Sequence, residues 1–288
     1  MIYLILAIVT SALVSLSIRA SENYIKNKYG MLLVNYGVCA LFSYFYMEKG
    51  MNYFVQAGSG FMIILGVLSG ILYLVTLLIM QYSTSKNGVV LSSTFMKLGV
   101  LIPTLMAILV FHEIPKMTQI IGILMAVAAI VLIQFEKKAL SEGNQKIWLL
   151  ILMFSGGITD SLANIYEQGA NPALRDGYLL NTFGVAAILS LVLAFSKGRK
   201  LSKADVLFGI LLGIPNYFSA KFLLLALANM KAVLVYPTNS VGTLVTISLV
   251  GVLVFKEKID RKKAVGIGMI VLALALLNIL RGFHGLLF

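Results

Sequence analysis

The sequence predicts an all-α integral membrane protein with ten transmembrane helices in a five-plus-five inverted repeat. Three observations support this prediction. The 288 residues are 60% hydrophobic and 12% charged, with a mean hydropathy of +0.96, whereas soluble domains carry about 25% charged residues. Apolar runs of the length that a bilayer requires recur along the whole chain. The second half of the chain also repeats features of the first half.

Each expected span is an apolar run bounded by a short, charged connection, and no connection is long enough for a separate soluble domain. The longest polar connection in the middle, Glu136 to Lys146, divides the spans five and five. We therefore expect one membrane domain, with a first repeat over residues 1–140 and a second, inverted repeat over residues 141–288. The expected spans are residues 2–18, 31–47, 60–82, 88–111, 117–135, 147–165, 178–196, 205–228, 232–255 and 264–280.

Several function classes are disfavoured at this stage. The first apolar run is interpreted as a span and not as a signal peptide, because no basic segment precedes it and Arg19 follows it. The net charge of +12 is explained by basic loops, so we expect no nucleic-acid partner. A single cysteine, Cys39, excludes an intramolecular disulfide and a cysteine-based metal cluster. We expect no cofactor and no metal.

The fourth and ninth spans carry the clearest copy of the repeat. The stretch from Asn87 to Gly122 is repeated in the stretch from Met230 to Gly266, and the closing glutamates and glycines match at a shift of 144 positions. Each copy ends its span in a glutamate, Glu113 or Glu257, and a glycine follows each glutamate after nine residues. Small-xxx-small glycine pairs, which let membrane helices approach closely, recur at a shift of 143. These pairs are Gly66 with Gly70 and Gly209 with Gly213.

The odd number of spans in each repeat determines the topology of the second copy. Five spans bring the chain to the opposite face of the membrane, so the second repeat is inserted upside down. In such folds the substrate site lies near the midplane, between the repeats. The loops after the odd-numbered spans carry 16 basic residues and the other loops carry 5. The positive-inside rule then places the first set in the cytoplasm and both termini outside the plasma (inner) membrane.

Lys97 is the first candidate for substrate binding. It lies ten residues after Asn87, about 15 Å along a helix, and Ser93 and Thr94 precede it by one turn. A charge at this depth costs about 3 kcal/mol on insertion scales. This favours a role for Lys97 in binding a substrate or a coupling ion; the alternative is a structural salt bridge to Asp160.

The eighth and ninth spans supply further candidates. Lys221 follows Tyr217 by one turn in the eighth span, and it is either a substrate ligand or a lysine that extends to the headgroups. At a shift of 143 its counterpart is Leu78, so the charge is not repeated. A polar stripe runs along one face of the ninth span and lines a wet cavity or holds helices together. It comprises Tyr236, Asn239, Ser240, Thr243 and Thr246.

The acidic candidates fall into two groups. Asp160 is the only acidic residue clearly inside an expected span, and it is the candidate for proton coupling or for pairing with a lysine. Glu113 and Glu257 close the fourth and ninth spans beside basic residues. Because span ends are wet, we expect a structural role for both glutamates.

The segments from Lys97 to Glu113 and from Tyr236 to Glu257, in a five-plus-five chain, resemble the EamA-like branch of the drug/metabolite transporter superfamily. The resemblance covers the whole chain and implies a secondary transporter or exporter of small metabolites. Two features depart from that family. His112 and Lys256 precede the glutamates where the family often has glycine, and the family usually keeps its termini in the cytoplasm.

The hypothesis that we favour is a secondary active transporter of a small polar metabolite bearing a carboxylate or phosphate, embedded in the lipid bilayer and coupled to a proton or another ion. The alternative is a multidrug exporter of lipophilic cations, which the two lysines disfavour. A membrane-embedded enzyme is a remote third hypothesis, because His112 and His284 are the only histidines and no HExxH-like pair is present.

Overall fold

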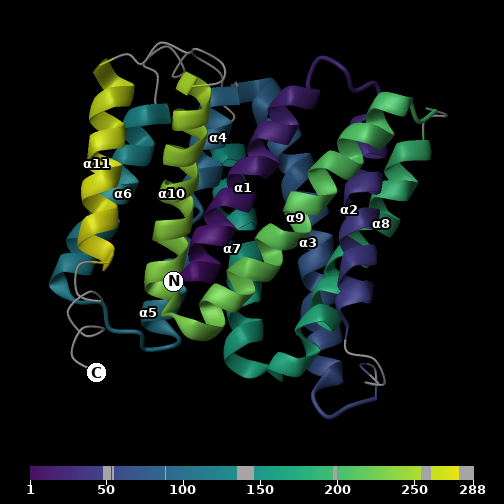
Figure 1. Ribbon diagram of the computed structural model, residues 1–288, viewed down its shortest axis with the longest axis horizontal. Coiled ribbons are helices and arrows are strands. Elements are labelled where there is room, and N and C mark those ends of the chain that lie inside the picture. The colour runs from purple at the N-terminus through teal and green to yellow at the C-terminus, as the bar shows by residue number, and fades with distance from the viewer. Residues whose placement is uncertain are drawn as a thin grey trace. The chain divides into compact units, whose positions relative to one another are not determined.

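The fold is known from a computed structural model, which describes residues 1–47, 53, 55–87, 89–134, 146–196, 200–253 and 261–278. Within these residues the chain forms helices and no strand (Figure 1). The helices are α1 (Ile2–Ser21), α2 (Lys28–Tyr46), α3 (Ser59–Asn87), α4 (Val89–Leu98), α5 (Leu101–Leu109), α6 (Met117–Gln134), α7 (Lys146–Gly169), the short 3₁₀ helix η2 (Pro172–Leu174), α8 (Arg175–Phe195), α9 (Lys203–Asn229), α10 (Ala232–Leu253) and α11 (Arg261–Asn278).

The helices match the ten expected spans. Seven described segments are long and apolar enough to cross a bilayer, and the shorter apolar helices Met117–Ile133 and Ala264–Leu277 lie at the fifth and tenth spans. The fourth span differs from expectation, because α4 ends at Leu98 and α5 begins at Leu101. The protein is therefore an all-α, multi-pass membrane protein whose fourth span is interrupted.

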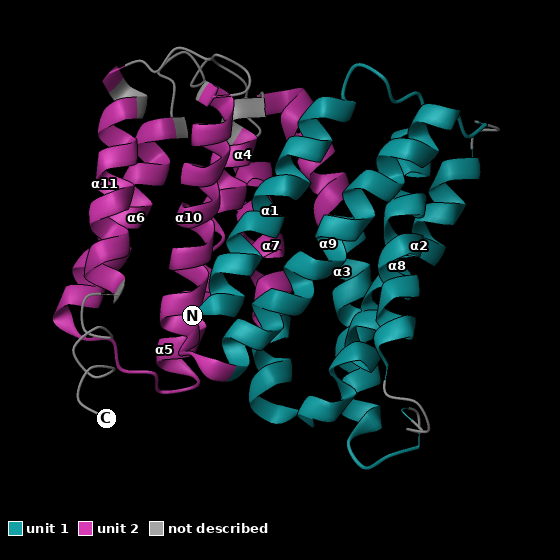
Figure 2. Cartoon of the chain, viewed as in Figure 1, with its two compact units in different colours: residues 1–75, 162–228 teal, residues 76–161, 229–288 magenta. Residues whose placement is uncertain are grey.

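The chain divides into two compact units, shown in Figure 2. Unit 1 comprises residues 1–75 and 162–228, and unit 2 comprises residues 76–161 and 229–288. Each unit thus combines helices from both halves of the sequence. The compact units and the predicted sequence repeats are different divisions of the chain.

In unit 1, α2 and α8 lie side by side. Tyr36 of α2 and Phe183 of α8 are equivalent positions at a shift of 147, and their rings stack with centroids 6.3 Å apart. The helices are antiparallel, because Asn27 at the start of α2 donates a hydrogen bond to the carbonyl oxygen of Ala194 near the end of α8. Two equivalent residues can contact one another only near a two-fold axis.

The predicted glycine pairs make the same contact twice. A Cβ added to Gly66 or Gly70 of α3 would meet α8 at Tyr178, Asn181, Thr182 and Val185. A Cβ added to Gly209 or Gly213 of α9 would meet α2 at Met31, Val34, Asn35 and Val38, which are the same four positions shifted by 147. The glycines therefore hold equivalent helices at backbone contact in unit 1.

Unit 2 shows the same symmetry between α6 and α11. A Cβ on Gly122 would meet Leu277, and a Cβ on Gly266 would meet Ile133. Both pairs of equivalent residues are separated by 144 positions, so the contact is reciprocal. Because the start of each helix meets the end of the other, the two-fold axis lies across the helices and the repeat is inverted.

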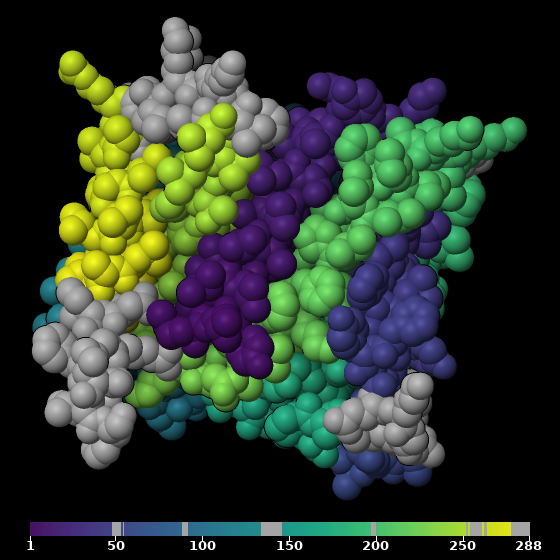
Figure 3. All heavy atoms as spheres, viewed as in Figure 1, coloured from purple at the N-terminus to yellow at the C-terminus, as the bar shows by residue number. Residues whose placement is uncertain are grey.

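In unit 1, α1 lies against α9, as Figure 3 shows for the purple and green segments. The hydroxyls of Ser11 and Ser219 are 2.7 Å apart, and the rings of Tyr3 and Phe222 stack. α1 is thus part of the folded bundle of unit 1.

Candidate functional site

Lys97 lies in the last turn of α4, where the fourth span is interrupted. Two hydrogen bonds of the i→i+3 type span the interruption. The Gly99 N–H donates to the carbonyl oxygen of Met96, and the Val100 N–H donates to the carbonyl oxygen of Lys97. The backbone there lies against α7, since a Cβ on Gly157 would be 2.5 Å from the Gly99 carbonyl oxygen. Transporters often build ion and substrate sites at such discontinuous helices.

Asp160 lies one turn beyond Gly157 on α7, and its side chain is exposed. Because Gly157 packs on Gly99, Asp160 lies near Lys97, which is half-buried. No ion pair or hydrogen bond joins the two side chains among the residues that the structure describes. The two opposite charges are therefore near enough to interact but are not in contact.

Tyr236, the first residue of the polar stripe of α10, contacts Asp160. The hydroxyl of Tyr236 donates a 2.6 Å hydrogen bond to the backbone carbonyl oxygen of Asp160. Within the described part of the chain, Thr238 Oγ1, Asn239 Oδ1 and Thr243 Oγ1 are buried without a hydrogen-bond partner. Pro237 has no N–H, which removes one helical bond from α10. Unpaired buried polar atoms are rare, so this stretch of α10 offers hydrogen-bonding capacity that the fold does not use.

The remaining predicted residues of α4 and α10 also lie in unit 2. Thr94 is buried, and Ser93 and Ser240 are half-buried. Unit 2 therefore brings together Lys97, Asp160 and Tyr236 from three different helices.

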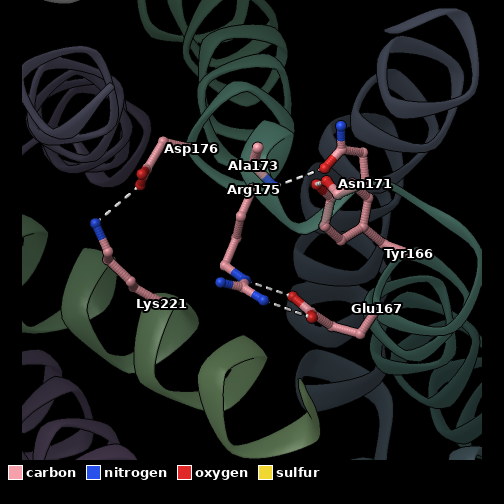
Figure 4. Close-up of polar contacts among 7 residues, drawn as sticks. All are labelled: Tyr166, Glu167, Asn171, Ala173, Arg175, Asp176 and Lys221. Atoms are coloured by element: carbon pink, nitrogen blue, oxygen red, sulfur yellow. Dashed lines mark hydrogen bonds and ion pairs between the residues drawn. The ribbon is translucent and has the colours of Figure 1, made fainter. Parts of the chain in front are cut away.

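Lys221 and Tyr217 lie in unit 1, and Lys221 is paired. Its ammonium is 3.0 Å from Oδ1 of Asp176 (Figure 4). It is also 3.1 Å from the Tyr217 hydroxyl. The expected seventh span begins at residue 178, which leaves Asp176 in the preceding loop. In fact α8 begins at Arg175, so Asp176 occupies its first turn. Acidic residues are favoured in the first turn of a helix. Asp176 is therefore a sequence signal that the helix begins before residue 178.

A second ion pair lies next to the first. Arg175 donates two hydrogen bonds to Glu167 of α7, from Nε at 2.6 Å and from an Nη at 2.8 Å (Figure 4). The Tyr166 hydroxyl donates to the carbonyl oxygen of Asn171, whose side chain caps η2. The turn from α7 to α8 is thus held by several polar contacts.

Glu113 binds the start of α10. Its two carboxylate oxygens accept hydrogen bonds from the backbone N–H groups of Ala232, at 3.0 Å, and Val233, at 2.8 Å. A carboxylate satisfies N–H groups that a helix start leaves unpaired and complements the helix dipole. Glu257, its counterpart in the repeat, lies outside the described residues.

Comparison with known proteins gives a consistent result. Residues 145–279 match the model of the EamA-like transporter family. An uncharacterised protein of Haemophilus influenzae (strain ATCC 51907 / DSM 11121 / KW20 / Rd) is 29% identical over 278 residues, covering 92% of this chain and 93% of that protein. A solved crystal structure superposes with a TM-score of 0.79 at 12% identity, covering 97% of this chain and 96% of the other.

Proposed function

We propose that the chain is a member of the EamA-like transporters of the drug/metabolite transporter superfamily, whose model matches residues 145–279, and that it is a secondary active transporter of a small polar metabolite bearing a carboxylate or phosphate. The family match indicates a membrane transporter of small molecules. The substrate class and the coupling are our proposals. We place the protein in the plasma (inner) membrane with both termini outside, following the distribution of basic residues.

Lys97 carries this proposal. Its ammonium lies within the fourth span and lacks a direct ion-pair partner among the described residues. A charge in that position is costly unless a partner compensates it. A carboxylate or phosphate of the substrate would supply that partner. Lys221 is less suited to the role, since Asp176 already neutralises it.

The neighbouring groups of unit 2 have roles that follow from their chemistry. Asn239 and Thr243 supply unused hydrogen-bonding atoms for a polar substrate. Asp160 is the candidate proton-coupling group, because a carboxylate that lies near Lys97 without an ion pair to it can gain or lose a proton as the substrate arrives or leaves. The proposed cycle is alternating access, which inverted-repeat transporters use.

A thermal-shift screen of the purified protein tests this function. The screen compares amino acids, sugar phosphates, nucleosides and quaternary amines, because any ligand of the folded state raises the unfolding temperature by mass action. We expect carboxylates or phosphates to stabilise the wild-type protein and not Lys97→Met. Stabilisation by quaternary amines alone would instead support the exporter of lipophilic cations.

A further inference from the structure

The ammonium of Lys221 is surrounded by three different groups of unit 1. The Asp176 carboxylate lies at 3.0 Å, the Tyr217 hydroxyl at 3.1 Å, and the Tyr46 ring lies with its centroid at 4.1 Å. The Tyr217 hydroxyl in turn donates to Asp176 at 3.2 Å. Each of the three N–H bonds of the ammonium therefore has a group to meet.

These groups form a receptor that does not depend on the lysine being attached to the chain. A carboxylate, a phenol oxygen and an aromatic face are the groups that recognise an ammonium ion. They come from α8, α9 and α2 and are tied together by the stacking of Tyr46 on Tyr217 at 5.8 Å. Tyr217 is fully buried, so its hydroxyl is held in one place.

Arg175, the other basic residue nearby, does not compete with Lys221 for Asp176. Arg175 is adjacent to Asp176 in the chain, but both of its hydrogen bonds shown in Figure 4 go to Glu167. The Glu167–Arg175 pair is neutral by itself. The negative charge of Asp176 therefore remains for the cation beside Tyr46 and Tyr217.

The internal repeat provides a comparison within the same chain. At a shift of 143, Tyr217 and Lys221 correspond to Leu74 and Leu78. At a shift of 147, Tyr46 and Asp176 correspond to Leu193 and Tyr29. The equivalent positions hold no charge, so the symmetric packing of α3 on α8 and of α9 on α2 does not require an ion pair.

We propose that Asp176, Tyr217 and Tyr46 form a binding site for a primary ammonium group, which Lys221 fills as a tethered cation. The site is separate from the anion-binding role proposed for Lys97 and does not rest on it. Because the protein supplies its own cation, this site is occupied without any free ion. Removal of the tether converts it into a site for a free ammonium ion of matching size.

The test uses the purified full-length protein with Lys221→Ala. This substitution removes the atoms that n-propylammonium contains, three carbons and one nitrogen. We expect n-propylammonium chloride to raise the unfolding temperature of Lys221→Ala saturably, and to leave the wild-type protein and Lys221→Ala with Asp176→Asn unchanged. Potassium chloride is the control for ionic strength, and 1-propanol is the control for binding of the uncharged propyl chain. Leu78→Ala is the control for an equivalent cavity that has no carboxylate beside it.

Three outcomes overturn the proposal: no saturable response of Lys221→Ala, an equal response to 1-propanol, or an equal response of the double variant. If Lys221→Ala does not yield folded protein, Lys221→Met is the second variant, because it keeps the stem and vacates the position of the ammonium nitrogen. Ammonium chloride should then stabilise Lys221→Met more than sodium chloride does, and equal effects of the two salts reject the site.

Discussion

The backbones of Gly99 and Gly157 lie in direct contact, so that a Cβ on Gly157 would come within 2.5 Å of the carbonyl oxygen of Gly99. This contact holds the interruption of the fourth span against α7. Lys97 lies two residues before Gly99, and Asp160 lies three residues after Gly157. The distance between the two opposite charges in unit 2 therefore depends on the packing of two glycines, which have no polar side chain of their own.

The first prediction concerns this contact. Gly157→Ala would press a methyl group against the Gly99 carbonyl and Ile102, which we expect to destabilise the protein by about 1–3 kcal/mol. The neighbouring Gly156 is a matched control on the same helix, because its Cβ would meet only Thr76 at 3.9 Å. Alanine is about 1 kcal/mol better than glycine inside a helix, so Gly156→Ala should be neutral or stabilising. Equal unfolding temperatures of the two variants would contradict this account.

The glycines also show how much of the fold was accessible from the sequence. Gly66, Gly70, Gly209 and Gly213 were identified as repeated contact positions, and the structure gives them equivalent partners in α8 and α2. At these four positions glycine lets two helices approach closely, so the spacing of the glycines predicts which helix face is packed. Gly99 was not identified as an interruption, because a single glycine inside an apolar run is compatible with a continuous helix.

The charged side chains were less predictable than the glycines. The sequence showed that Lys97 and Asp160 lie within spans, and it left open whether they form a salt bridge. It could not show that Lys221 meets Asp176, since the two residues are 45 positions apart and helix ends are uncertain by a few residues. Pairing between helices depends on their relative rotation, which periodicity alone does not give.

The second prediction concerns the start of α10. Glu113→Ala leaves the N–H groups of Ala232 and Val233 without their carboxylate. Hydrogen bonds to a charged group contribute about 1.5–3 kcal/mol, so we expect a loss of about 2 kcal/mol and a smaller loss for Glu113→Gln, which keeps one acceptor. The comparison is Gln119→Ala, which removes an exposed side-chain bond to the Lys116 N–H and should cost about 1 kcal/mol or less. A denaturant titration that ranks Gln119→Ala as the more damaging change would refute the assignment.

The third prediction concerns orientation. From the 16 basic residues of one face and the 5 of the other, we predict that Lys200 is cytoplasmic and Gly50 is outside. The native thiol is first removed with Cys39→Ala, and a single cysteine is then introduced at either position. An impermeant thiol reagent applied to intact cells should label the Gly50 position and not the Lys200 position. The reverse pattern would show that the termini are cytoplasmic, as is usual in the family.

The fourth prediction concerns Lys97. Lys97→Met keeps the volume of the stem and removes the charge. If the ammonium binds an anionic substrate, Lys97→Met should fold and insert, and it should lose both transport and the thermal stabilisation by the ligands found in the screen. Lys97→Arg should keep part of the transport and part of the thermal stabilisation, since it preserves the charge with a different geometry.

The double variant separates substrate binding from charge balance. If Lys97 serves only to neutralise Asp160, then Lys97→Met combined with Asp160→Asn removes both charges together and should restore activity, because a single change leaves one charge uncompensated. If Lys97 binds substrate, the double variant stays inactive, although its unfolding temperature recovers relative to Lys97→Met. Restored transport in the double variant would therefore defeat the proposed anion site. Full transport by Lys97→Met alone would exclude the charge-balance role as well.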